Sequence, residues 1–251
     1  DHRDLHSLRR RQRQMCIRDS NYIYNTGSDS VFGYKTWARV YVLNNYIYGN
    51  RGYWGAIHPH YGHNFIVIGN RLENVWGGIR HAKVAVGNYV ETNAMGGIVG
   101  SDYGSAILGN FDIFNGANTT YPCGINAWGE NSSVVGNVVK GEGYAKRGIV
   151  AKFSSKAEIK NTIIANNVIS DCEIGIQTEY RSNMIIEGNT ILNSKYTGIR
   201  VYNASDAVGY YTVIANNIID TTNTYDGICV KYANKTRIYR NTILNVNLSL
   251  I

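Results

Sequence analysis

Short apolar runs separated by Gly-Asn or Asn-Asn pairs recur along nearly the whole chain. Runs such as 65–68, 162–164 and 211–214 are rich in β-branched residues and have the length of strands, and no segment shows a sustained 3.6-residue periodicity. The asparagine that ends each pair returns about every 24.5 residues, a period that indicates stacked supersecondary units. These asparagines are Asn45, Asn70, Asn88, Asn110, Asn137, Asn167, Asn189, Asn217 and Asn241.

A second phased signal, a Gly-Ile pair, lies between the asparagines, with a looser first copy at 55–57. Three short strands in a unit of about 24 residues are typical of one coil of a parallel β-helix, whereas a leucine-rich repeat needs phased leucines that are sparse here. The sequence therefore predicts an all-β fold, a right-handed parallel β-helix of about 9–10 coils over residues 21–251, because parallel crossovers are overwhelmingly right-handed. One interior column is expected to contain Ile57, Ile79, Ile98, Ile125, Ile149, Ile176, Ile199 and Ile228. The asparagines are expected to sit at a corner and to hydrogen-bond along it.

Residues 1–20 do not follow the repeat and hold six arginines. Three interpretations stay open: a basic arm for an anionic surface, a targeting peptide that lacks the apolar region of a secretory signal, and a non-native segment. The third is favoured because residues 15–20 resemble translated sequencing-adapter sequence. We expect this leader to be non-native or disordered. We also expect the chain to be a fragment of a longer protein, because it stops within a coil without a capping element.

Composition fits an ordered chain: 44% of the 251 residues are hydrophobic and 17% are charged. No apolar stretch approaches the ~18 residues of a membrane helix. The net charge is +7, and six arginines against three aspartates in the leader leave the coils only mildly basic. Such a surface suits an acidic polymer, but a nucleic-acid partner is not expected, because a dense Lys/Arg stripe is missing. Four cysteines show neither metal-site spacing nor a disulfide framework, and the disulfide state of Cys123, Cys172 and Cys229 stays open.

The strand that begins at each Gly-Ile pair has a register that can be followed from coil to coil. Because the isoleucine points inward, the next residue and the one two positions beyond it point outward. The residue between them is mostly small or apolar; His81 is the exception, either swung out by a bulge or buried with a partner. The outward positions combine cationic, amide and aromatic groups, as a polysaccharide groove requires. On or beside this face, the predicted substrate-binding residues are Trp54, Trp76, Asn126, Trp128, Lys152, Gln177, Arg200 and Tyr202.

The densest chemistry lies in residues 53–63, which hold three of the six histidines. Period-two spacing places His58 and His60 on one face, with Arg80 beside His58 in the next coil. The stretch Gly-Ala-Ile-His-Pro-His at 55–60, followed by Phe-Ile-Val-Ile-Gly-Asn, resembles the Gly-Ile-Asp-Pro-His segment of β-helical mannuronan epimerases. Those enzymes and the related alginate lyases act at carbon 5 of a uronic acid. The resemblance implies that His60 matches the catalytic histidine and that His58 replaces the aspartate. The repeat pattern alone is also similar to copper-loading periplasmic β-helix proteins and to phage tailspikes.

These residues predict a lyase or epimerase for an acidic polysaccharide. His60 is the expected base, Arg80 or His58 the partner of the substrate carboxylate, and Tyr61 a proton donor. Glycoside hydrolysis and calcium-dependent elimination fit less well because both need acidic clusters. Extracellular, periplasmic or cell-surface localisation is expected.

Two other classes stay open. One is a non-catalytic carbohydrate-binding or adhesive rod. The other is a metal-binding β-helix in which His58 and His60, with His63 or His81, hold zinc or copper. No cofactor is required by the favoured mechanism, although calcium or a His-bound transition metal stays an alternative. The sequence does not indicate the oligomeric state.

Overall fold

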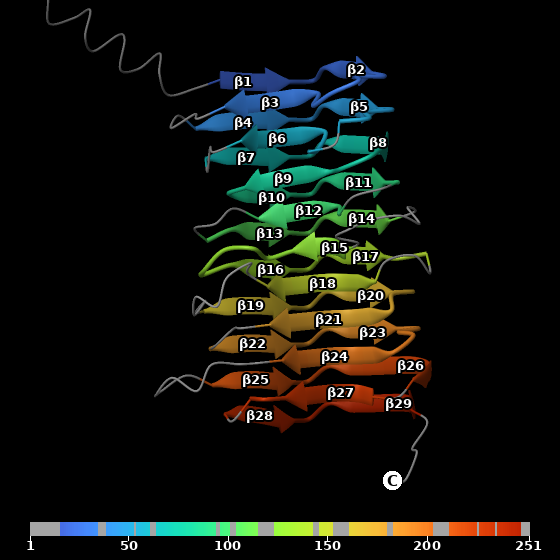
Figure 1. Ribbon diagram of the computed structural model, residues 1–251. Coiled ribbons are helices and arrows are strands. Elements are labelled where there is room, and N and C mark those ends of the chain that lie inside the picture. Colours follow the sequence, from blue (N-terminus) through green and yellow to red (C-terminus); the bar gives the residue numbers. More distant parts are fainter. Residues whose placement is uncertain are drawn as a thin grey trace, which may run out of the picture.

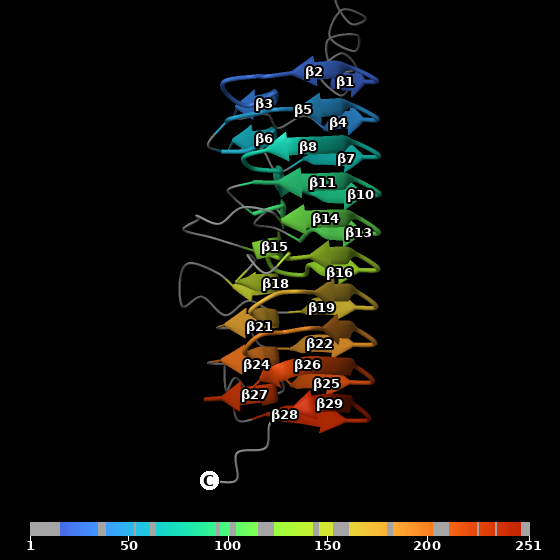
Figure 2. The same ribbon diagram turned by 90° about the vertical axis from the view of Figure 1, so that its right-hand side faces the viewer.

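In the computed structural model, all regular elements of the described residues are parallel strands stacked into one solenoid (Figures 1 and 2). The structure describes residues 16–34, 39–52, 54–60, 64–93, 96–100, 104–114, 123–142, 146–152, 161–179, 183–202, 211–224, 226–233 and 235–246. Three sheets of ten, ten and nine strands run along the rod, and each coil adds one strand to each sheet. The predicted parallel β-helix of 9–10 coils is confirmed.

Sheet A has ten strands and begins before the predicted start of the repeat. It contains β1 (Cys16–Asp19), β4 (Val40–Leu43), β7 (Phe65–Ile68), β10 (Val84–Val86), β13 (Ala106–Leu108), β16 (Ser133–Val135), β19 (Thr162–Ala165), β22 (Met184–Glu187), β25 (Thr212–Ala215) and β28 (Thr236–Tyr239). Strand β1 pairs in register with β4, so the first coil includes residues 16–19 of the expected leader. Residues 1–15 of that leader lie outside the described residues.

Sheet B follows sheet A across a sharp corner in every coil. It contains β2 (Tyr22–Tyr24), β5 (Tyr46–Tyr48), β8 (Arg71–Val75), β11 (Tyr89–Thr92), β14 (Phe111–Phe114), β17 (Val138–Lys140), β20 (Val168–Ser170), β23 (Thr190–Leu192), β26 (Ile218–Thr224) and β29 (Thr242–Val246).

Sheet C carries the Gly-Ile pairs. It contains β3 (Val31–Tyr34), β6 (Ile57–His60), β9 (Ile79–Ala82), β12 (Ile98–Gly100), β15 (Cys123–Asn126), β18 (Arg147–Lys152), β21 (Ile174–Glu179), β24 (Thr197–Tyr202) and β27 (Asp226–Lys231). The predicted isoleucine column is confirmed: each member is in register with the next, from Ile57 to Ile228. Its first seven members are fully buried and Ile228 is half-buried.

The corner between sheets A and B is closed by the asparagine ladder, which extends from Asn21 to Asn241. Each side-chain Nδ2 donates to the Oδ1 of the ladder asparagine in the next coil at 2.9–3.0 Å, and each backbone N–H donates to the same oxygen. The predicted hydrogen-bonded column is therefore confirmed. The left-handed conformation belongs to the preceding residue, whose φ lies between 52° and 67° in every coil. This explains why Gly or Asn stands before most ladder asparagines, since those residues adopt positive φ at least cost.

The glycine of the Gly-Ile pair is required by the close approach of sheets B and C. A Cβ on Gly148, Gly175 or Gly198 would collide with the inward isoleucine of sheet B in the following coil. A larger residue at these positions would push the two sheets apart.

Shortening a member of the isoleucine column should test the interior directly. We expect Ile149→Ala to lower the free energy of unfolding by about 2–5 kcal/mol through the cavity that it leaves. The control Ile218→Ala removes the same atoms from an outward side chain that is 47% exposed, and it should cost less than about 1 kcal/mol. Urea unfolding measures both, and equal losses would contradict the assigned register.

Candidate functional site

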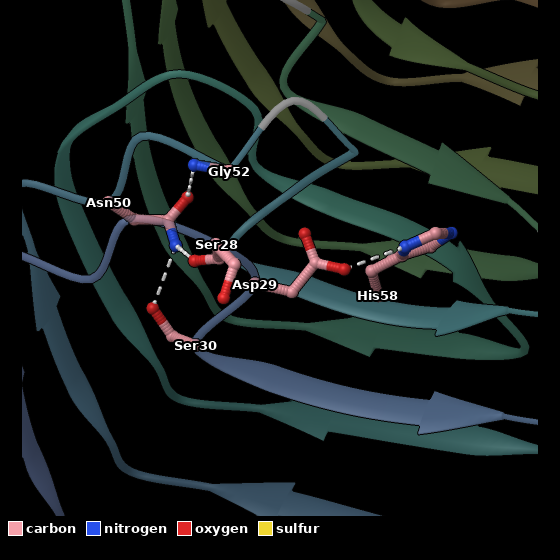
Figure 3. Close-up of polar contacts among 6 residues, drawn as sticks. All are labelled: Ser28, Asp29, Ser30, Asn50, Gly52 and His58. Atoms are coloured by element: carbon pink, nitrogen blue, oxygen red, sulfur yellow. Dashed lines mark hydrogen bonds and ion pairs between the residues drawn. The ribbon is translucent and has the colours of Figure 1, made fainter.

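An ion-paired histidine lies on sheet C near the amino-terminal end of the rod. His58 Nδ1 is 3.1 Å from Asp29 Oδ2, and only 1% of His58 is exposed (Figure 3). Because an ionised carboxylate only accepts hydrogen bonds, Nδ1 carries the proton in this contact. The contact joins β6 to the turn that precedes β3, one coil earlier.

A buried asparagine holds the turn that carries Asp29. Asn50 Nδ2 donates to Ser30 Oγ at 3.0 Å and to the carbonyl oxygen of Ser28, and its Oδ1 accepts from the N–H of Gly52 at 3.1 Å (Figure 3). Asn50 Nδ2 also lies 2.7 Å from Thr26 Oγ1. A Cβ on Gly52 would lie only 2.7 Å from the carbonyl carbon of Ser28, so a side chain there would displace the turn. Asn50 and Gly52 therefore fix the position of Asp29. Sequence reasoning missed all three residues, although the Ser-Asp-Ser run at 28–30 and the Asn-Arg-Gly run at 50–52 were visible signals.

Three aromatic rings surround His58. Trp54 stacks on it with centroids 6.0 Å apart, Phe32 meets it edge-on at 5.8 Å, and His81 is tilted at 6.0 Å. Trp54 is 51% exposed, so a polar pair lies directly beneath an accessible indole. Packed rings and an ion pair give His58 little room to rotate.

His81 reaches this cluster through a β-bulge. The pairing of β9 with β12 shifts by one residue, so that Gly100 pairs with Ala82, and His81 has a φ of 50°. Ala82 is fully buried and takes the inward place, which corrects its expected outward position, while His81 is half-buried. Of the two alternatives for His81, the structure shows the bulge.

The structure describes the other predicted catalytic residues only in part. His60 ends β6, in register with Tyr34. The His60 side chain and all of Tyr61 lie outside the described residues. Arg80 is half-buried in β9, one position from the Ile57–Ile79 pair. Trp76, which follows β8, is 44% exposed.

The predicted binding residues farther along sheet C are less open than an exposed groove requires. Asn126 and Gln177 are 8% and 4% exposed. Gln177 Oε1 accepts from Arg147 Nε at 2.7 Å and its Nε2 donates to Glu179, so both ends of this amide are engaged within the protein. Trp128, Arg200 and Tyr202 are half-buried, and Lys152 is in register with Glu179 but its side chain lies outside the described residues. Apart from Ala82, the described outward positions keep the predicted register, but fewer of their side chains are exposed than a groove requires.

The three cysteines whose side chains the structure describes do not form a reactive or metal-binding group. Cys123, Cys172 and Cys229 are free thiols and buried. Burial raises the pKa of Cys123 to about 12 and also raises the pKa of Cys172, so both thiols stay protonated at neutral pH. Neither is suited to act as a nucleophile or a thiolate ligand.

A separate pocket of about 490 Å³ lies at the corner that follows sheet B and contains none of the predicted site residues. It is lined by Lys140, Glu142, Asp171, Cys172, Glu173, Asn193 and Lys195, with Lys140 Nζ 3.1 Å from Glu142 Oε1. It shares no residue with the Asp29–His58 cluster.

A comparison with protein-family models identifies the family to which this repeat belongs. The model described as "Periplasmic copper-binding protein (NosD)" matches residues 81–249, more than half of the chain. The chain belongs to the NosD family. The matched segment of this NosD-family chain begins after Asp29, Trp54 and His58, so family membership does not cover the cluster around His58. A comparison with curated proteins gives no match.

Solved structures share the fold at low sequence identity. A tailspike double mutant of E. coli bacteriophage HK620 is 10% identical with a TM-score of 0.57, over 90% of this chain and 49% of that one. A double mutant of the periplasmic alginate epimerase AlgG is 10% identical with a TM-score of 0.56, over 92% and 73%. A tailspike mutant of the same phage in complex with a pentasaccharide is 12% identical with a TM-score of 0.50, over 95% and 56%. The chain spans about half the length of the tailspikes.

The described residues offer no binding site for the copper that the family description names. They contain no group of three His, Cys, Asp or Glu side chains arranged to hold a metal ion. His58 and His81 lie close together, but Nδ1 of His58 is already bound to Asp29. A third imidazole would have to come from His60 or His63, whose side chains lie outside the description. The described part of the chain also has no helix with the length and hydrophobicity needed to cross a membrane.

Proposed function

We propose that this NosD-family chain acts on an acidic, uronate-containing polysaccharide by removing the proton at carbon 5 of a uronic acid, as a lyase or an epimerase. The observation that carries the proposal is the Asp29–His58 contact beneath the exposed Trp54. It anchors β6 where a polar, aromatic surface meets the outer face of sheet C. Residues held this firmly suit a reaction that depends on positioning.

His60 acts as the base in this proposal. It is two residues beyond His58, so strand alternation directs it to the same side of the sheet as the anchored histidine. An imidazole has a pKa close to neutral pH and is matched to proton removal there. Asp29 and His58 are positioning residues, because His58 is too deeply buried to contact a polymer.

The remaining steps need a cation and a proton donor. Arg80 pairs with the substrate carboxylate, which accepts negative charge as the carbon-5 proton leaves. The resulting carbanion is either reprotonated on the opposite face, which inverts carbon 5, or expels the oxygen at carbon 4, which leaves a double bond. Tyr61 supplies the proton to the carbon or to the leaving oxygen.

Aromatic platforms and mild positive charge support binding of such a polymer. Trp54 and Trp76 expose 51% and 44% of their surfaces, and indole rings stack on sugar faces. Trp128, Lys152, Arg200 and Tyr202 would extend the surface along the rod, with Asn126 and Gln177 supporting it from below. The NosD family and the alginate epimerase AlgG are both described as periplasmic. We propose a periplasmic or extracellular location for this chain.

The purified chain should be incubated with polymannuronate, polyguluronate, pectate and glycosaminoglycans in deuterium oxide. Ultraviolet absorbance of unsaturated uronate detects elimination, and NMR detects deuterium entering carbon 5 during epimerisation. We expect one polymer to give one of these signals. Binding without either signal would favour the non-catalytic carbohydrate-binding rod, and no binding to any of the polymers would reject a glycan function.

A further inference from the structure

The outer face of sheet A is almost entirely apolar. From β4 to β25, the outward positions are occupied by aliphatic residues, alanine or tyrosine, except for Ser133 and Glu187. These strands stack one above another along the left side of Figure 1. Sheet B lies in the same coils and carries Arg71, Glu73, Glu91, Lys140 and Asp220 on its outer face. The contrast shows that the lack of charge belongs to one face and not to the repeat as a whole.

This apolar face is open. Ile68, Ile163 and Ile185 are 38%, 38% and 37% exposed. On a flat sheet, side chains in the strands about 4.8 Å above and below cover much of each residue, so these values indicate that no other described residue lies over them. Monomeric soluble proteins rarely expose a contiguous apolar patch larger than a few hundred Å². A patch of this kind marks a surface that another molecule covers.

The dimensions of the face fit a small protein interface. Eight strands about 4.8 Å apart and three to four residues wide give a height of roughly 38 Å, a width of roughly 10–13 Å and an area of about 400–500 Å². Two such faces together bury about 800–1,000 Å², the size of a weak or transient protein–protein contact. Because the contact is small, the complex should be weak and depend on concentration.

We propose that the outer face of sheet A binds the same face of a second copy of this chain. Both copies have the same spacing between coils, so the rows of side chains on one can pack into the gaps between rows on the other, as in a sheet-on-sheet packing. A two-fold axis through the middle of the face makes the contact closed and self-complementary. Glu187 in β22 then lies away from the axis, and the two carboxylates are directed to opposite ends of the interface.

One coil offers a matched pair of variants. Ile163 in β19 of sheet A and Val168 in β20 of sheet B are both outward and β-branched, and they are 38% and 40% exposed. Sedimentation velocity should be measured for the unaltered chain, Ile163→Lys and Val168→Lys from about 1 to 100 µM. We expect the unaltered chain and Val168→Lys to shift to twice the chain mass with rising concentration. Ile163→Lys should raise the dissociation constant at least tenfold, because an ammonium would be buried within the contact.

Circular dichroism and urea unfolding confirm that each variant is folded, and Ile185→Lys replaces Ile163→Lys if the latter does not fold. A chain that stays monomeric at 100 µM would overturn the proposal. Dimers that survive Ile163→Lys, or that are lost equally in Val168→Lys, would place the contact elsewhere and also overturn it.

Discussion

Replacing Asn137 with alanine is expected to lower the free energy of unfolding by about 3–6 kcal/mol, among the largest effects of a single substitution in this chain. Asn137 is fully buried in the ladder. Its Oδ1 accepts from the backbone N–H and the Nδ2 of Asn110, and its Nδ2 donates to Asn167 Oδ1 and to the carbonyl oxygen of Ile107, all at 2.9 Å. Alanine removes the side chain, so these buried partners lose their hydrogen bonds. Each buried polar group left unsatisfied costs about 1–3 kcal/mol.

The first residue of the same ladder provides the control. Asn21 donates its Nδ2 to Asn45 Oδ1 at 2.9 Å, but it is exposed, so water can replace the lost bonds. Asn21→Ala should cost less than about 1 kcal/mol. Urea unfolding of the two variants separates a buried ladder from a merely repeated residue. Equal losses would show that the ladder contributes nothing beyond local turn preference.

Replacing Asp112 with valine is expected to stabilise the protein at pH 7 by about 2–4 kcal/mol. Asp112 lies in the inward column of sheet B, in register with Val90 and Val139, and it is completely buried. Neither of its carboxyl oxygens has a hydrogen-bond partner in the part of the chain that the structure describes. Gly97 and Gly124 leave the space that the carboxyl occupies. Valine, found at the adjacent positions of the column, fits there without a polar atom.

The effect of Asp112 should depend on pH. Burial raises the pKa of its carboxyl well above the usual range, so the folded chain keeps a proton that the unfolded chain releases above about pH 4. The folded state then binds more protons, and its stability falls as pH rises from about 4 toward the folded-state pKa.

Urea unfolding at pH 4 and pH 7 should therefore show a larger advantage of Asp112→Val at pH 7. Asp112→Asn, which cannot ionise, should lose the same part of the pH dependence while keeping a buried polar group. A valine variant that is less stable than the unaltered chain at pH 7 would mean that the carboxyl is satisfied in the fold.

Much of the scaffold could be predicted from the sequence because one residue type repeats for one physical reason. Gly-Ile pairs mark the thin interior between sheets B and C, and the isoleucine column follows in register from Ile57. The ladder asparagines could also be recognised from their regular spacing in the sequence. The left-handed conformation falls on the residue before each ladder asparagine, because conformation and hydrogen bonding are divided between the two residues of each pair.

The candidate site was less predictable because it breaks the repeat. Asp29 reaches His58 across 29 positions from a turn, and no periodicity connects them. The bulge at His81 shifts the alternation of inward and outward residues by one position. The sequence pattern shows His81 as an exception but does not reveal where its side chain lies. Burial of Asn126 and Gln177 depends on what covers the sheet, and strand alternation alone does not contain that information.

Strand β6, anchored by Asp29, is proposed to position the base that acts on a uronate polymer. The deciding measurement is the turnover rate of the unaltered chain, His60→Ala, Asp29→Asn and the distant control Lys231→Ala, followed as unsaturated-uronate absorbance for elimination or as deuterium entry at carbon 5 for epimerisation. We predict a loss of at least about 100-fold for His60→Ala, which removes the base. Asp29→Asn should lower the rate and alter its pH profile, while Lys231→Ala stays within a few fold. Equal rates for His60→Ala and Lys231→Ala, with all variants folded, would contradict the account.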